Sequence, residues 1–177
     1  MNYPIIGIRN YETLEQLGTK EKFWFYDDNT KITKLFKIGR PGTGENWAEK
    51  AASELAKLLT IPCAVYDFAI WNGKEGVASP IFVPKYGGLI HGNELLATFS
   101  AKYPSAQMYK VHEYQLSTVL NLLHELAKTV SLPLDYSEND TIKTASDMFI
   151  AYLMFDCWIS NPDRHHENWG FVSDSIN

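Results

Sequence analysis

The sequence contains little cysteine and no long apolar segment. Its two cysteines, Cys63 and Cys157, match no metal-binding spacing and no disulfide framework, so we expect two reduced thiols in the core. No apolar run reaches the roughly 18 residues that a membrane-spanning helix requires. Charged residues occur too early at the N-terminus for a signal peptide. These absences favour a soluble cytoplasmic protein that does not contact a membrane.

Basic residues are also in the minority. The 177 residues include 16 Lys and Arg against 21 Asp and Glu, a formal net charge of −5. This balance argues against an extended surface for nucleic acids, and we expect no direct nucleic-acid binding. Hydrophobic residues make up 45% of the chain and aromatic residues 14%, which is enough for a packed core. The length fits one domain or a small two-lobed one.

The N-terminal half of the chain favours short strands interrupted by one helix. The helix is predicted over residues 45–59, with Thr43 as its N-cap. Its apolar face would contain Trp47, Ala51, Leu55, Leu58 and Leu59. Apolar or alternating segments predict strands at residues 3–10, 22–28 and 30–39, and two further strands around the Asn72-Gly73 turn.

Helical periodicity dominates the C-terminal half. Residues 113–130 carry one apolar stripe, and residues 139–159 carry another with Asp140 as a candidate N-cap. We therefore predict an α+β, two-lobed fold. Its N-lobe would be an antiparallel β-sheet with one helix over residues 1–98, followed by a partial helical C-lobe over residues 99–177.

Five consecutive ionisable residues, 163–167, follow the second predicted helix. Asp163 and Asn168 have the spacing of a kinase catalytic loop, in which the Asp orients the attacking hydroxyl and the Asn holds magnesium. The same cluster could instead be a solvated loop. A third interpretation is a metal-ligand cluster around His165 and His166.

A site of this type also requires a Lys on an N-lobe strand and a Glu on the following helix. Lys37 and Glu49 occur in that order, and Lys37 points away from the side chains of its neighbours Phe36 and Ile38. The alternative for Lys37 is a solubility residue of an edge strand. Residues 40–46 lack the Gly-Lys-Ser/Thr ending of a Walker A loop and are interpreted as a strand-to-helix turn.

Several segments together resemble the HipA-like bacterial serine/threonine kinases, which are toxins of toxin–antitoxin operons and distantly similar to phosphatidylinositol 3- and 4-kinases. These segments are GTKEK (18–22), LFKIG (35–39), ENWAEKAASELAKLL (45–59), HGNELL (91–96) and NPDRHHENWGFV (161–172). The resemblance implies a protein-kinase-like fold for the two lobes. It also implies ATP and Mg as cofactors and a protein substrate, with aminoacyl-tRNA synthetases as the recurrent target class. It also implies an antitoxin protein as a partner.

The resemblance assigns roles to individual residues. Asp163 would be the catalytic Asp, Asn168 a catalytic residue and metal ligand, and His165 would face the nucleotide together with Asn168. Lys37 would contact the ATP phosphates and pair with Glu49. The loop over the phosphates would consist of Gly18, Thr19, Lys20, Glu21 and Lys22, and the backbone that meets adenine would be that of Phe82 and Val83.

Two features depart from the family pattern. The phosphate loop offers Thr19 in place of a regulatory Ser. The family's second metal-binding Asp lies well beyond the Asn, whereas Asp174 follows Asn168 by only six residues and is interpreted as a surface-turn residue. The resemblance thus implies a C-terminally incomplete kinase, which we expect to bind ATP weakly and not to turn over by itself. The alternative is a non-catalytic, pseudokinase-like fragment that binds nucleotide or a partner protein.

Overall fold

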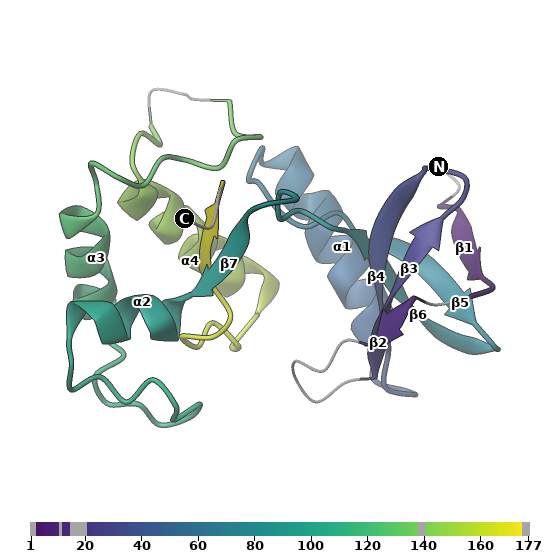
Figure 1. The fold of residues 1–177 in the computed structure, drawn as a ribbon, viewed down its shortest axis with the longest axis horizontal. Coiled ribbons are helices and arrows are strands. Elements are labelled where there is room, and N and C mark those ends of the chain that lie inside the picture. The colour runs from purple at the N-terminus through teal and green to yellow at the C-terminus, as the bar shows by residue number, and fades with distance from the viewer. Residues whose placement is uncertain (1–2, 11, 15–20, 138–140, 175–177) are drawn as a thin grey trace. The chain divides into compact units, whose positions relative to one another are not determined.

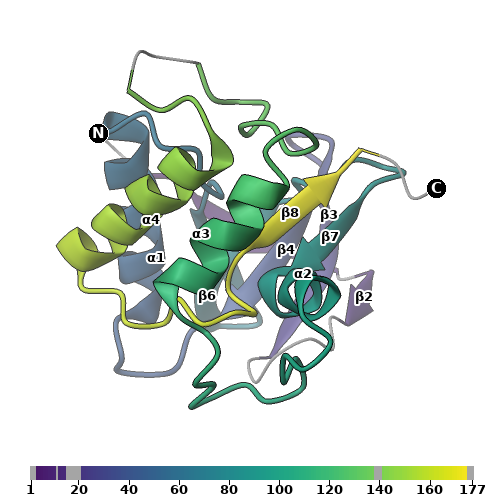
Figure 2. The ribbon, with the colours of Figure 1, turned by 90° about the vertical axis from the view of Figure 1, so that its left-hand side faces the viewer.

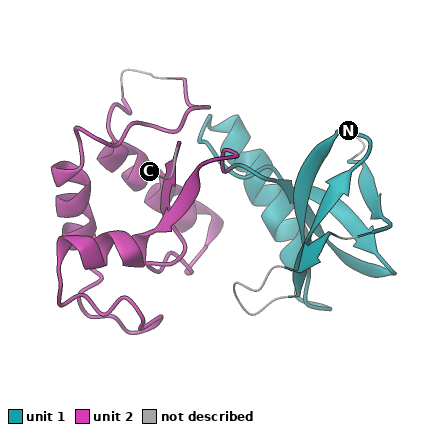
Figure 3. Ribbon diagram, in the orientation of Figure 1, with its two compact units in different colours: residues 1–82 teal, residues 83–177 magenta. Residues whose placement is uncertain are grey.

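The computed structural model describes residues 3–10, 12–14, 21–137 and 141–174. The chain divides into two compact units, residues 1–82 and residues 83–177 (Figure 3). Each unit has its own hydrophobic core. The two units are therefore described separately.

The described residues of the first unit form a six-stranded sheet and one helix (Figure 1). The strand order in the sheet is β1-β5-β6-β4-β3-β2, and the helix α1 (Glu45–Leu58) connects β4 to β5. All neighbouring strands are antiparallel except β1 and β5, which pair in parallel. The strands are β1 (Ile5–Ile8), β2 (Thr13–Leu14), β3 (Lys22–Asp27), β4 (Ile32–Ile38), β5 (Asp67–Trp71) and β6 (Lys74–Pro80).

Alternation along the strands separates the two faces of this sheet. Phe23, Phe25 and Phe36 are buried in one hydrophobic core, and because side chains alternate along a strand, Lys37 lies on the opposite face. The predicted turn between β5 and β6 is confirmed. Asn72 and Gly73 have φ angles of 47° and 76°, and both values are positive, as a two-residue type I′ hairpin turn requires.

The buried face of α1 differs from the predicted apolar face. Trp47 is 65% exposed and Leu58 is 80% exposed, whereas Lys50, Ser53 and Ala56 are buried. These residues face the chain that follows the helix, where Ser53 Oγ donates to the carbonyl of Ala64. Polar contacts of this kind set the rotation of α1 about its own axis. The spacing of apolar residues in the sequence does not reveal them. The N-cap is Gly44, with a φ of 71°, and not Thr43, because the turn requires a left-handed residue there.

In the part of the second unit that the structure describes, three helices and a two-stranded sheet pack around a core of their own (Figures 1 and 2). Its helices are α2 (Gly92–Phe99), α3 (Leu116–Glu125) and α4 (Ala145–Ile159), and its strands are β7 (Gly88–His91) and β8 (Gly170–Ser173). β7 and β8 pair antiparallel. The core consists of Leu95, Leu96, Tyr103, Val119, Leu122, Leu123 and Phe149.

The structure places the boundary between the units earlier in the chain than the predicted division at residues 98 and 99. The second unit begins at Val83. The physical reason is that β7 pairs with β8 near the end of the chain. In addition, α2 contributes Leu95 and Leu96 to the core of the second unit, so this segment is held by contacts that lie far away in sequence.

Helix α4 begins with a capping box. Its N-cap is Thr144, whose Oγ1 accepts a hydrogen bond from the Asp147 backbone N–H at 3.1 Å. The Asp147 carboxylate in turn accepts from the Thr144 backbone N–H at 2.9 Å. Such reciprocal bonds satisfy two donors that the helix itself leaves unpaired. The predicted N-cap Asp140 lies outside the described residues.

Both cysteines are free thiols. Cys63 is half-buried, but Cys157 is exposed, so the prediction of two core thiols is wrong for Cys157. Its side chain lies on the outer side of α4, because the inward positions near it are taken by Phe155 and Asp156. Among the described residues, no helix has the length and apolarity needed to cross a membrane.

Candidate functional site

Lys37 and Glu49 meet in the first unit as predicted. Lys37 lies near the end of β4 and Glu49 lies on α1, and Lys37 Nζ is 3.6 Å from Glu49 Oε2. The same Nζ donates a hydrogen bond of 2.8 Å to the hydroxyl of Tyr66. Burial by itself would lower the pKa of Lys37, but Tyr66 and Glu49 outweigh burial and raise this pKa above its usual value. Lys37 is thus a firmly charged, half-buried cation.

The predicted phosphate loop is described only at its end. Gly18, Thr19 and Lys20 lie outside the described residues. Glu21 is exposed and pairs with Lys74 at 3.0 Å, and Lys22 opens β3 in direct register with Lys37. Two antiparallel neighbours in register point to the same face of a sheet, so Lys22 lies on the face that carries Lys37.

The residues predicted to meet adenine flank the boundary of the two units. Phe82 ends the first unit and is 61% exposed, while Val83 begins the second unit and is half-buried. They follow β6, the strand that pairs with the Lys37-bearing strand β4. Nothing else in the geometry of the described residues assigns them a ligand.

Asp163 and Asn168 meet in the second unit. The side-chain amide of Asn168 donates to the backbone oxygen of Asp163 at 2.6 Å and to the Asp163 Oδ2 at 3.0 Å. Both residues are exposed. Because the Asn168 nitrogen faces Asp163, the amide oxygen Oδ1 points elsewhere and has the chemistry of a hard-metal ligand.

Arg164 and Asp156 hold this loop against the end of α4. The guanidinium of Arg164 makes two hydrogen bonds to the buried Asp156 carboxylate and a third, of 2.9 Å, to the backbone oxygen of Asn168. Asn161 donates to the same carboxylate at 2.8 Å, and its Oδ1 accepts from the Asp163 N–H at 3.2 Å. Asp156 therefore organises the loop on which Asp163 and Asn168 lie.

The two adjacent histidines do not converge on one ion. His166 is buried, and its Nδ1 shares a 2.7 Å hydrogen bond with the hydroxyl of Tyr103. Burial lowers the pKa of His166, which favours the neutral ring. His165 instead lies 3.6 Å from Asp163 Oδ1 and against the ring of Tyr109. The described part of the chain contains no cluster of three His, Cys, Asp or Glu side chains that could hold a metal.

Three residues of these networks were not identified from the sequence. Asp156 supports the loop, Tyr66 contacts Lys37, and Tyr114 donates to the backbone oxygen of Arg164 while accepting from Trp169 Nε1. An acidic residue inside an otherwise apolar helix was a usable signal for Asp156. The two tyrosines have no comparable local signal. Trp169 packs on the core of the second unit.

Asp174 follows β8 and is exposed. The strand that follows the loop is β8, which begins at Gly170 and pairs with β7. Its position agrees with the interpretation of Asp174 as a surface residue.

Comparison with known proteins identifies a structural neighbour. No protein-family model and no curated protein sequence matches the chain. The chain is similar to the crystal structure of a Helicobacter pylori proinflammatory kinase, CtkA, with a TM-score of 0.69 and 16% sequence identity. The similarity covers 99% of this chain, which spans 56% of the length of that kinase. The α+β chain described here therefore has a two-lobed, kinase-like fold.

Proposed function

We propose that this chain belongs to a serine/threonine protein kinase of the HipA-like type that uses ATP and Mg. The observation that carries the proposal is the ion pair of Lys37 and Glu49. Protein kinases require such a pair between an N-lobe strand and the following helix. The order of Lys37 and Glu49 in the sequence predicted the pair. The two residues lie on different elements, β4 and α1.

The loop of the second unit supports the same proposal. Asp163 would accept or orient the proton of the attacking Ser or Thr hydroxyl, and its exposure leaves it accessible to a protein substrate. The bonds from Asn168 to Asp163 and from Arg164 to Asp156 hold the loop in one conformation. A rigid loop suits phosphoryl transfer, because catalysis of this reaction is mostly positioning and electrostatic stabilisation.

The residues present fit ATP and Mg in part. Lys37 offers a charged donor for phosphate oxygens, and Asn168 Oδ1 is an oxygen ligand suited to Mg. When bound, Mg neutralises charge on the transferred phosphoryl group. Among the described residues, Asn168 is the metal ligand that we propose, and His165 would contact the nucleotide beside it. Glu21 and Lys22 remain proposed contacts of the phosphate loop, and Phe82 and Val83 remain proposed contacts of adenine.

The substrate and partners are further proposals. We propose a protein substrate of the aminoacyl-tRNA synthetase class and an antitoxin as a binding partner, on the basis of the sequence resemblance alone. We also propose that the protein is cytoplasmic and that it binds neither nucleic acid nor a membrane.

The function is tested by incubating the purified chain, alone and extended at its C-terminus by a complete catalytic lobe, with labelled ATP, Mg and a generic protein substrate. The Asp163→Asn variant of each form is assayed alongside. Calorimetry with ATP is run in parallel. Transfer of label by the wild type that is lost in Asp163→Asn would support the kinase. ATP binding without transfer in both forms would favour the non-catalytic module that binds nucleotide, and absence of ATP binding and of transfer in both forms would overturn the proposal.

A further inference from the structure

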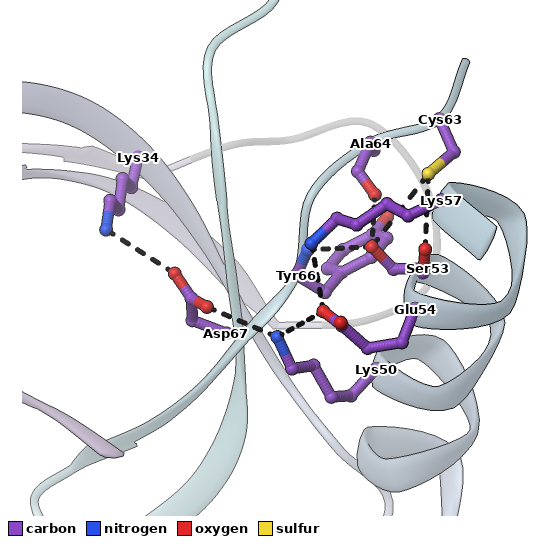
Figure 4. Close-up of polar contacts among 9 residues, drawn as sticks. All are labelled: Lys34, Lys50, Ser53, Glu54, Lys57, Cys63, Ala64, Tyr66 and Asp67. Atoms are coloured by element: carbon purple, nitrogen blue, oxygen red, sulfur yellow. Dashed lines mark hydrogen bonds and ion pairs between the residues drawn. The ribbon is translucent and has the colours of Figure 1, made fainter. Parts of the chain in front are cut away.

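Tyr66 lies in the short segment between α1 and β5, and this segment is fastened to α1 (Figure 4). Ser53 of α1 donates to the carbonyl of Ala64 at 3.0 Å and accepts from the backbone N–H of Tyr66 at 3.4 Å. The thiol of Cys63 also approaches the backbone oxygen of Ser53 at 3.6 Å. The backbone of Tyr66 is therefore attached to the helix that carries Glu49.

A chain of charges holds the next residue, Asp67. One carboxylate oxygen of Asp67 accepts from Lys50 of α1 at 3.4 Å, and the other lies 3.8 Å from Lys34 of β4 (Figure 4). Lys50 is buried and also donates to Glu54 at 2.9 Å. Asp67 therefore connects α1 with β4 of the sheet. Because Asp67 directly follows Tyr66, these contacts also fix the position of Tyr66.

The side chain of Tyr66 contacts Lys37 directly. Its hydroxyl accepts the 2.8 Å hydrogen bond from Lys37, and its ring centroid lies 4.9 Å from Lys37 Nζ. Burial raises the pKa of Tyr66, and although the charge of Lys37 lowers it, burial and the nearby Glu49 carboxylate prevail and the pKa lies above its usual value. The hydroxyl consequently stays protonated and can donate to the Glu49 carboxylate while accepting from Lys37.

The ion pair needs this third member. Lys37 Nζ and Glu49 Oε2 are 3.6 Å apart, which is longer than the roughly 2.7–2.9 Å of a direct charge-assisted hydrogen bond. The hydroxyl of Tyr66 supplies the short contact that the two charged groups lack. Lys22 is the other titratable group in register beside Lys37, and as a like charge it cannot take that role.

We propose that Tyr66 is a positioning residue that keeps Lys37 and Glu49 together in the geometry for binding phosphate. The consequence for nucleotide binding rests on the proposed kinase function. The contact between the three side chains does not rest on that function. Tyr66 therefore acts through Lys37 and is assigned no contact with the substrate or the nucleotide.

The test compares Tyr66→Phe, which keeps the ring and removes the hydroxyl, with Tyr26→Phe, which removes an exposed hydroxyl from β3 of the same sheet. The rate at which Lys37 reacts with an amine-specific reagent is followed by mass spectrometry from about pH 7 to 11, the range in which lysines titrate. We expect the midpoint for Lys37 to move to lower pH in Tyr66→Phe and to stay unchanged in Tyr26→Phe. At pH 8 the rate should rise severalfold, because the unprotonated fraction of Lys37, which is the form that reacts, grows as its pKa falls.

Glu49→Gln serves as a positive control and should move the midpoint in the same direction. An unchanged midpoint in Tyr66→Phe would overturn the inference, even if the wild type binds ATP. Where the wild type binds ATP, Tyr66→Phe should weaken that affinity severalfold, and unchanged affinity would also overturn the positioning role. A wild type without ATP binding would contradict the proposed function alone, because the midpoint of Lys37 still reports on the contact.

Discussion

The guanidinium of Arg164 donates two hydrogen bonds, of 2.6 and 2.9 Å, to the carboxylate of Asp156, one to each oxygen. The side chain of Asp156 is only 6% exposed. Two parallel bonds of this kind fix both distance and orientation. The pair therefore anchors the loop that carries Asp163 and Asn168 to the last turns of α4.

Asp156→Ala should destabilise the protein by about 3–5 kcal/mol, because it leaves the Arg164 cation and the Asn161 amide without their buried acceptor. The free energy of unfolding is measured by denaturant titration. Asp174→Ala is the matched control, since Asp174 is exposed, and its effect should stay within about 0.5 kcal/mol. Equal effects of the two substitutions would contradict the anchoring role of Asp156.

Lys37→Ala should weaken ATP binding at least severalfold, a loss of about 1 kcal/mol or more for a charge-assisted contact. Titration calorimetry measures the affinity. Lys31→Ala removes an exposed lysine from the turn between β3 and β4 and should leave the affinity unchanged. Equal ATP affinity for the wild type and Lys37→Ala would remove Lys37 from the site.

In a chain that carries the full catalytic lobe, Asp163→Asn and Asn168→Ala should separate chemistry from binding. Asp163→Asn should abolish phosphoryl transfer yet leave nucleotide affinity nearly intact, because Asp163 acts on the attacking hydroxyl. Asn168→Ala should also reduce the dependence of ATP binding on Mg, because it removes the proposed metal ligand. Affinities are compared by calorimetry with and without Mg. Full transfer activity in Asp163→Asn would show that residues 163–168 are not a kinase loop.

Asp27 should make the free energy of unfolding depend on pH in the acid range. Burial alone would raise its pKa, but hydrogen bonds from Lys34, Thr30 and the backbone of Asn29 outweigh burial and lower the pKa from 3.8 to about 2. The unfolded chain then binds more protons in this range, so the stabilisation is complete above pH 3.8 and is lost as pH falls through about 2. The loss amounts to about 2 kcal/mol.

The substitution Asp27→Asn tests this dependence. It should flatten the fall in unfolding free energy between about pH 4 and 2, and should cost about 3 kcal/mol at neutral pH because Lys34 loses a buried partner at 2.8 Å. Asp28→Asn is the neighbouring control, with a side chain that is 88% exposed. An acid profile of Asp27→Asn that matches the wild type would contradict the role of Asp27.

The sequence by itself predicted features that depend on local patterns. Alternating aromatic residues located β3 and β4, and Asn72-Gly73 located the hairpin, because strand pleating and turn geometry act over a few residues. Apolar periodicity located α3 and α4. The meeting of Asp163 with Asn168 could also be anticipated, since both lie on one short loop.

Only the tertiary structure decided which distant groups meet. The pairing of β7 with β8 joins segments near opposite ends of the second unit. Neither short strand has a sequence pattern strong enough to predict it. The rotation of α1 was set by Ser53, Lys50 and their partners after the helix, against its apolar stripe. The contact of Tyr66 with Lys37 depends on that rotation. Such contacts arise from packing and desolvation of groups far apart in the chain, and the order of residues encodes them only through the whole fold.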